Sequence, residues 1–347
     1  DNRSVYSDSP TAERLFTTLR KDANDSLPFV FAHVGGRYAD IAMHDDEIEV
    51  AVEVHSAWGT FEWLVEEALD RGYRIGIVGN SDGHKCRPGS SYPGAGEFGS
   101  LGGLTCVLAG SLDRESLYQA IKARRFYATT GNRPLVSVRV VGPDGREALM
   151  GDSLSAGSLQ LVATVAGTAP VERLEVRNGT SERLVLRPYT AEQLGRRVKV
   201  LWSGAEVKGR ARMARWDGRI EVSGNRIVGA RPVNFWNPLH PVQRHGDTGL
   251  SWKSTTTGGF SGVILELENN DSGELRIETA QGEARLSVSG IGIEPITHEY
   301  GGLRKRMDIY RLPDQLQADP FSVQVDLVTR GPRRQRAIRL ADGTTPV

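Results

Sequence analysis

An aspartate and a histidine two residues apart follow an apolar run in the first third of the chain. Asp82 and His84 lie in the segment Asn80-Ser81-Asp82-Gly83-His84, directly after residues 74–79. In extended backbone, residues i and i+2 face the same side, so a carboxylate and an imidazole can converge on one point. Such oxygen and nitrogen ligands together suit a divalent ion such as zinc, manganese or iron. A plain turn is the alternative, since Ser, Asp and Gly are common turn residues.

Two earlier apolar runs also end in residues that can bind a metal ion. Residues 27–33 end in His33, and residues 50–55 carry Glu53 and His55, which are again two residues apart. In parallel α/β folds, functional residues collect at the carboxyl ends of the strands. One histidine at a strand end is usually a hydrogen-bonded structural residue. Three strand ends of this kind together favour a metal site.

Helical segments separate several of these strands. Residues 11–20 and 60–71 have helical spacing, and a third helix is expected to begin after Ser111. Further strands are expected at residues 104–109 and 126–131. This alternation of strands and helices predicts a parallel α/β sheet or barrel over residues 1–134.

Past Pro134 the pattern changes to short alternating runs separated by turns. Residues 136–140, 159–163, 198–202 and 263–267 are examples, and Asn178-Gly179 predicts the turn of a hairpin. We therefore expect residues 135–347 to form an antiparallel, sandwich-like β region.

Composition narrows the function classes. The 347 residues include 43 Lys plus Arg and 43 Asp plus Glu, so no basic surface for nucleic acid is predicted. No apolar run approaches the ~18 residues of a membrane span, and no signal-peptide pattern opens the chain. We expect a cytoplasmic protein, although the first residue is Asp1 and the compartment stays open. The two cysteines exclude a disulfide scaffold and a cysteine-based zinc module.

The strand-end segments resemble a known family. Residues 31–33, 53–55 and 81–84, followed by residues 125–131, are similar to the carboxyl-terminal half of a PHP (polymerase and histidinol phosphatase) domain. More narrowly, residues 33–37, 58–63 and 81–85 resemble a subfamily that attaches a β-rich tail to the barrel. The resemblance is close over residues ~1–135 and looser over the β region.

The resemblance implies a distorted (β/α)7 barrel that binds two or three zinc, manganese or iron ions and hydrolyses small phosphate esters. His33, Asp82 and His84 match metal ligands of the family. Glu53 and His55 match a strand end near the metals, and His55 is the better ligand candidate. PHP domains open with an H-x-H strand and a D-H pair, and neither precedes His33. We therefore expect the chain to be the later part of a longer protein, with about half of the metal site.

The expected mechanism is attack by metal-activated water on a phosphoester. His55 and Arg37 are the catalytic candidates, and the loop cations Arg37, Lys85 and Arg87 are expected to hold the substrate phosphate. His44 is either a further ligand or general acid, or a surface histidine in a polar loop.

Two other functions remain open at this point. The same metal chemistry could cleave an amide or a glycosidic bond. Alternatively, the β region could be a non-catalytic module that binds carbohydrate or protein partners. Its tryptophans could stack on sugars, although core packing is the commoner fate of tryptophan. The candidate residues for that surface are Trp202, Trp216, Trp236 and Trp252.

Overall fold

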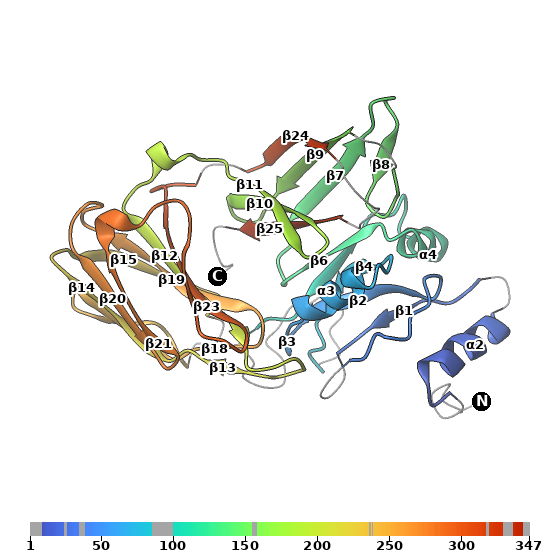
Figure 1. Cartoon of the computed structure of the whole chain (residues 1–347), viewed down its shortest axis with the longest axis horizontal. Coiled ribbons are helices and arrows are strands. Elements are labelled where there is room, and N and C mark those ends of the chain that lie inside the picture. The colour runs from blue at the N-terminus through green and yellow to red at the C-terminus, as the bar shows by residue number, and fades with distance from the viewer. Residues whose placement is uncertain are drawn as a thin grey trace.

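The structure is a computed structural model that describes residues 9–23, 26–34, 39–84, 100–154, 158–235, 237, 239–316, 319–328 and 336–342. Strands dominate these residues, and the strand-rich end lies opposite helix α2 in Figure 1. The expectation of a (β/α)7 barrel, or part of one, is wrong.

Three short α-helices occur in the described part of the chain. They are α2 (Ala12–Asp22), α3 (Glu62–Asp70) and α4 (Arg114–Lys122). Thr11 caps α2 and Asp113 caps α4, each by accepting a hydrogen bond from a backbone N–H three residues later. Among the described helices, none has the length and apolar character needed to cross a bilayer.

The first sheet contains three parallel strands. Strand β2 (Glu49–Ser56) pairs in parallel with β1 (Val30–Ala32) on one side and β4 (Gly76–Gly79) on the other. The short β3 (Gly59–Thr60) turns back antiparallel on β2. Helix α3 connects β3 to β4 and packs Leu64 and Ala68 into the core beside Val52. The three parallel strands therefore end along the same edge.

The parallel arrangement stops after β4, which is why no barrel closes. Strand β5 (Leu104–Val107) pairs with β6 (Phe126–Thr129), and this pair is antiparallel although α4 lies between the two strands. Phe126 packs with Ala51 and Val78 of the first sheet. A barrel needs parallel strands all the way round, and the described residues supply three.

Residues from 135 onward form two pairs of packed antiparallel sheets. The first pair consists of the sheets β24-β9-β7-β8 and β11-β10-β25. Its strands are β7 (Leu135–Val141), β8 (Glu147–Leu149), β9 (Ser158–Ala166), β10 (Val171–Asn178), β11 (Ser181–Leu186), β24 (Phe321–Val328) and β25 (Arg336–Asp342). Val165, Val171 and Leu174 fill the space between the two sheets. Figure 1 shows the red β24 and β25 beside the green β7–β11.

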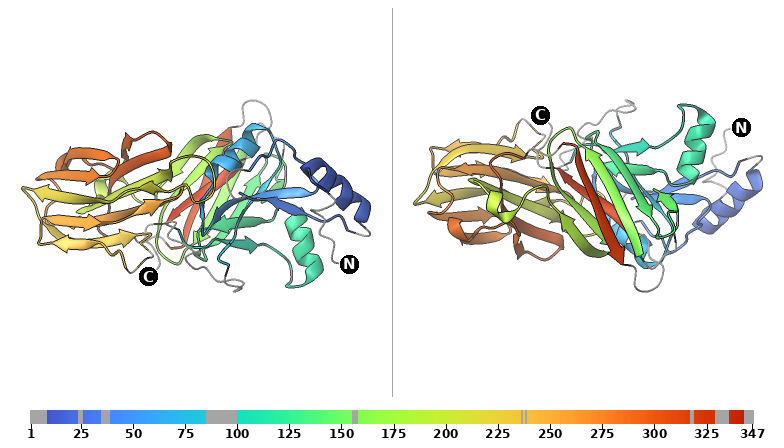
Figure 2. Two further views of the ribbon diagram at one scale, coloured as in Figure 1. Left: turned by 90° about the horizontal axis from the view of Figure 1, so that it is seen from below. Right: turned by 90° about the horizontal axis from the view of Figure 1, so that it is seen from above.

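The second pair lies between these segments in sequence. It consists of the five-stranded sheets β15-β19-β12-β23-β22 and β16-β17-β14-β20-β21, with the small pair β13-β18 beside them. Its larger strands are β12 (Arg197–Ala205), β14 (Gly218–Ser223), β15 (Ile227–Val233), β19 (Phe260–Leu267), β20 (Glu274–Thr279), β21 (Gly282–Ser287) and β23 (Leu303–Leu312). The shorter ones are β13 (Ala214–Arg215), β16 (Gln243–His245), β17 (Gly249–Trp252), β18 (Thr255–Thr256) and β22 (Ile296–Glu299). Figure 2 shows the two five-stranded sheets as stacked layers.

Three tryptophans lie in the core of this second sandwich. Trp202 and Trp216 are fully buried and Trp252 is 4% exposed. The rings of Trp202 and Trp252 stack with centroids 4.6 Å apart. Each indole N–H also donates a hydrogen bond inside the protein, as buried indoles require. These three side chains offer no surface to a sugar, and Trp236 lies outside the described residues.

A buried cluster of charges joins the two sandwiches. The carboxylate of Glu172 on β10 accepts hydrogen bonds from Lys199 on β12, at 2.6 Å, and from Tyr310 on β23, at 2.7 Å. Arg173 lies 2.7 Å from the same carboxylate. Burial alone would raise the pKa of Glu172, but the charges of Lys199 and Arg173 hold this pKa below its usual value.

We predict that Glu172→Gln lowers the free energy of unfolding by about 3–5 kcal/mol, because it leaves the Lys199 ammonium buried without its counter-charge. Glu294→Gln, which weakens the exposed pair with Arg187, should cost less than about 1 kcal/mol. Urea unfolding of both variants measures the difference. Equal losses in the free energy of unfolding would show that the buried cluster stabilises the fold no more than an exposed ion pair does.

Candidate functional site

The carboxyl ends of β1, β2 and β4 bring three polar side chains into one hydrogen-bonded chain. Glu53 on β2 accepts from the His33 ring, with Nδ1 and Oε1 2.8 Å apart, and from the Asn80 amide, with Nδ2 and Oε2 2.6 Å apart. Glu53 is 4% exposed, so both carboxylate oxygens are satisfied inside the protein. In open α/β sheets, ligands bind outside the carboxyl ends of parallel strands. This edge, which lies where β3 pairs with the carboxyl end of β2 (Figure 1), is the candidate site.

The loop after β4 is held in an unusual conformation. Asp82 and His84 both have positive φ, 45° and 53°, a left-handed geometry that non-glycine residues rarely adopt. The start of this loop is fixed by backbone bonds, from Asn80 N to His55 O at 3.0 Å and from Gly103 N to Asn80 O at 2.8 Å. A Cβ on Gly103 would lie 2.9 Å from both Asn80 N and His55 O, so glycine is required for this approach. Strained backbone held by its surroundings is common at functional sites.

Asp82 is surrounded by three groups from different parts of the chain. His84 Nε2 lies 2.9 Å from Oδ1, and Arg210 Nη2 lies 3.1 Å from Oδ2. The Trp58 indole donates to the Asp82 backbone carbonyl at 3.0 Å. The guanidinium of Arg210 stacks on the Trp58 ring, 3.7 Å from its centroid. The predicted pair of Asp82 and His84 is therefore in contact, within a wider cluster.

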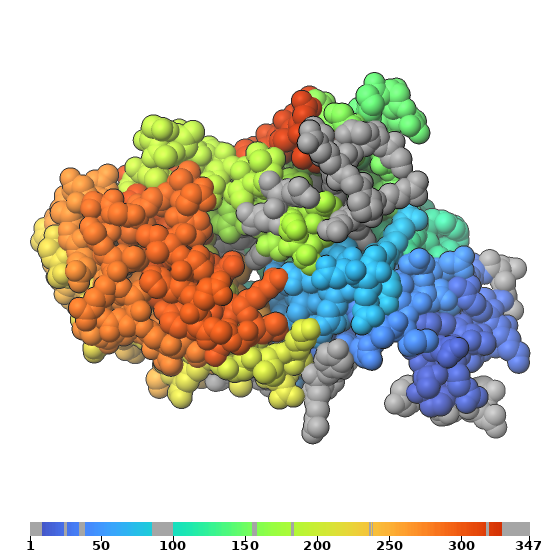
Figure 3. Space-filling model, viewed as in Figure 1, coloured from blue at the N-terminus to red at the C-terminus, as the bar shows by residue number. Residues whose placement is uncertain are grey.

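Arg210 reaches the site from the second sandwich, in the loop between β12 and β13. The N–H of Ala211 in this loop donates to the Trp58 carbonyl at 3.3 Å, and Lys208 pairs with Glu67 on α3. Figure 3 shows the yellow and orange β-rich part directly against the light-blue segment around α3. Arg210 was not predicted as a site residue, because nothing in its local sequence distinguishes it from other loop arginines.

His55, predicted as a ligand and a catalytic residue, is 4% exposed and hydrogen-bonded through both nitrogens. Nδ1 lies 2.8 Å from Thr60 Oγ1, and Nε2 lies 2.9 Å from Leu101 O. Because a carbonyl only accepts, Nε2 carries the proton and Nδ1 accepts from the Thr60 hydroxyl. Burial lowers the pKa of His55 to about 4. To bind a metal ion, His55 would have to give up one of these hydrogen bonds.

His33 has the opposite electrostatic environment. Its hydrogen bond with Glu53 raises the pKa of the imidazole above the ordinary 6.5, against the effect of partial burial. The charge of Asp82 also raises this pKa and that of Arg210 lowers it, so the His33 and Asp82 halves of the site act on each other electrostatically.

The donor types at this edge fit a divalent ion of the zinc, manganese or iron class. Among the described residues, however, no three His, Cys, Asp or Glu side chains are grouped closely enough to hold an ion. The arrangement is two pairs, His33 with Glu53 and Asp82 with His84. The carboxylate Oδ2 of Asp82 is buried and has no hydrogen bond, only the ion pair with Arg210, so it retains capacity for a further partner.

Three predicted cations lie outside the described residues, namely Arg37, Lys85 and Arg87. Their predicted substrate role, and the catalytic role of Arg37, stay predictions. His44 is described, and its side chain is 6% exposed rather than on the surface. It lies between Glu49 and Asp46 and stacks on Tyr73, with ring centroids 4.0 Å apart.

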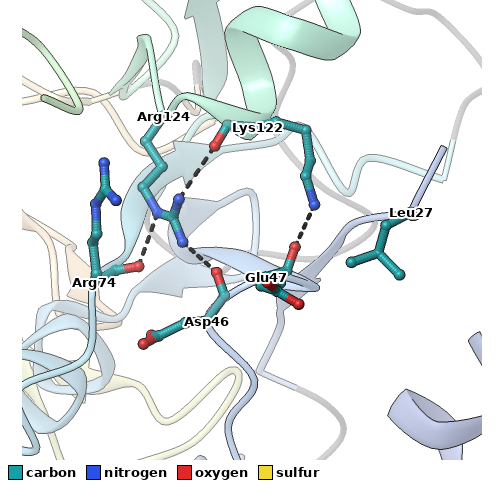
Figure 4. A pocket seen from close by; sticks show the side chains of 6 residues that line it. All are labelled: Leu27, Asp46, Glu47, Arg74, Lys122 and Arg124. Carbon is teal, nitrogen blue, oxygen red and sulfur yellow. Dashed lines mark hydrogen bonds between the residues drawn. The ribbon is translucent and has the colours of Figure 1, made fainter. Parts of the chain in front are cut away.

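A pocket at the opposite edge of the sheet belongs to the scaffold. It is lined by Leu27, Asp46, Glu47, Arg74, Lys122 and Arg124 (Figure 4). Arg124 donates to the backbone carbonyls of Arg74, Lys122 and Asp46, and Lys122 donates to that of Glu47. These bonds hold together the segments that lead into β2 and β4 with the end of α4. Arg124 and Lys122 thus donate their hydrogen bonds to the protein backbone, which indicates a structural role for this pocket.

Comparison with known proteins gives two relatives. An uncharacterized protein of Chlamydia pneumoniae is 31% identical over 203 residues, which is 50% of this chain and 31% of that protein. An uncharacterized protein of Chlamydia muridarum is 30% identical over 160 residues, 38% of this chain and 25% of that protein. The chain thus matches a third or less of each relative. No family model matches the sequence and no solved structure matches the chain, so the PHP resemblance stays a prediction.

We predict that His33 and His55 titrate on opposite sides of pH 6.5. NMR of the imidazole nitrogens should place the pKa of His33 above 6.5 and that of His55 at about 4. Glu53→Gln should return His33 towards 6.5. Because unfolded His55 takes up a proton near 6.5, its burial disfavours the fold progressively as pH falls from 6.5 towards 4. A His55 that titrates normally would contradict the buried, doubly bonded geometry.

Proposed function

We propose that the carboxyl edge of β1, β2 and β4 is part of the active site of a metal-dependent hydrolase, with a phosphoester as substrate. The observation that supports this most is the convergence of His33, Glu53 and Asp82 on one edge, from three strands separated in sequence. Further ligands would come from residues outside those that the structure describes. The resemblance of the same segments to the PHP family supports the reaction class.

Each residue has a separate task in this proposal. His33, Asp82 and His84 hold the ion, which when bound supplies an activated water and neutralises phosphoryl charge. Glu53 fixes the ring orientation of His33 by accepting from Nδ1, which leaves Nε2 as the ligand atom. Asn80 in turn fixes Glu53. His55 is buried and stabilises the end of β2 through its hydrogen bonds with Thr60 and Leu101.

The alternatives differ in their support. Cleavage of an amide or a glycoside by the same metal chemistry is tested by assaying the metal-loaded protein on amide and glycoside substrates beside phosphoesters. The sugar-binding module depended on exposed tryptophans, and Trp202, Trp216 and Trp252 are buried. No described feature therefore favours that module.

We predict that the protein, after loading with zinc, manganese or iron, retains at least one ion and hydrolyses p-nitrophenyl phosphate or its diester. His33→Ala and Asp82→Asn should lower kcat/KM by about 100-fold or more, because each removes a ligand. Elemental analysis and steady-state kinetics on the same preparations measure both effects.

Asp308→Asn is the matched control. Asp308 pairs with Arg306 on β23, so the same substitution is made in a carboxylate–arginine pair of the sandwich. Its activity should equal that of the unchanged protein. Full activity and metal content in Asp82→Asn would overturn the ligand assignment. Hydrolysis of amides or glycosides but not phosphoesters would overturn the substrate class.

A further inference from the structure

Arg210 is a guanidinium with unused hydrogen-bonding capacity beside the candidate site. It is 18% exposed, and its Nε is buried without a hydrogen-bond partner. Asp82 Oδ2 lies 3.1 Å from Nη2 of Arg210, yet the two atoms do not form a hydrogen bond, and Oδ2 has no hydrogen-bond partner either. Two unsatisfied polar atoms at one contact call for an explanation, because buried polar groups are normally paired.

The position of Arg210 is nevertheless well fixed. Its guanidinium carbon lies 3.7 Å from the centroid of the Trp58 ring, and the N–H of the next residue, Ala211, donates a hydrogen bond to the Trp58 carbonyl. Stacking on an aromatic face leaves the edge of the guanidinium, with its N–H donors, free to bind a planar or tetrahedral oxyanion. Arg210 is thus oriented by Trp58 and is only loosely engaged by Asp82.

We propose that Arg210, supplied by the β-rich region, is the residue that binds the anionic oxygens of the substrate. In the structure Asp82 neutralises Arg210 and competes with an anion for it. A cation held at Asp82 would neutralise this carboxylate and would leave the Arg210 guanidinium available to the substrate phosphoryl group. Cation binding at Asp82 and anion binding at Arg210 therefore strengthen each other, as linkage requires.

This inference rests on the proposed function for its substrate, but its test needs no metal ion. Asp82→Asn removes the competing negative charge and so mimics neutralisation by a cation. We predict that Asp82→Asn binds inorganic phosphate about tenfold or more tightly than the unchanged protein, measured by isothermal titration calorimetry in EDTA. The double variant Asp82→Asn with Arg210→Gln should lose the whole gain.

Arg215→Gln in the Asp82→Asn background is the matched control. Arg215 lies on β13, 73% exposed in a pair with Asp217, and its loss should leave phosphate binding unchanged. Arg210→Met, which keeps an apolar stem against Trp58, replaces Arg210→Gln if thermal unfolding shows that the glutamine variant does not fold. The gain in phosphate affinity should be lost in this variant as well.

The outcomes separate this inference from the proposed function. No gain in phosphate binding for Asp82→Asn, or a gain that survives loss of Arg210, overturns the role of Arg210 even if the protein hydrolyses phosphoesters. A gain that depends on Arg210 supports the anion site even if no hydrolysis is found.

Discussion

The partly buried negative charge of Asp82 needs charged or hydrogen-bonding partners, and this need constrains how the parts of the molecule fit together. Its side chain is 16% exposed and lies in the loop after the parallel strand β4, where water alone cannot compensate the cost of burial. His84 lies within hydrogen-bond distance of one of its oxygens, and Arg210 forms an ion pair with the other. Arg210 comes from a loop more than a hundred residues later in the chain. The contact between Asp82 and Arg210 therefore forms only when the α/β part and the second sandwich are docked.

Backbone contacts, as well as charged side chains, hold the α/β part against the second sandwich. Thr60 N donates to Thr257 O at 2.8 Å, which ties β3 to the second sandwich, and a Cβ on Gly59 would lie 2.5 Å from the same oxygen. Arg304 on β23 pairs with Glu62 and Glu66 on α3. On the other side of the second sandwich, the buried Glu172 and Lys199 join it to the first. The second sandwich is thus fixed on two sides, which gives Arg210 a defined position.

Local sequence predicted many of the separate elements. The strands before His33 and Asp82, the strand that carries Glu53 and His55, the helical segments and the Asn178-Gly179 hairpin follow from periodicity and turn chemistry, and the structure contains them. The barrel was wrong because strand direction depends on long-range pairing, and β5 and β6 pair antiparallel across α4. Burial of His55 and the approach of Arg210 were not predictable for the same reason. Their partners, Leu101 and Asp82, are 46 and 128 residues away.

The most direct test of the account is where a divalent ion binds. Crystals grown with zinc or manganese would show the ion by anomalous diffraction. The account predicts a peak at the Asp82 carboxylate, near His84 and His33, with the guanidinium of Arg210 moved off Oδ2 but still stacked on Trp58. An Asp82–Arg210 pair that stays intact at saturating metal, with no ion at this edge of the sheet, would contradict it.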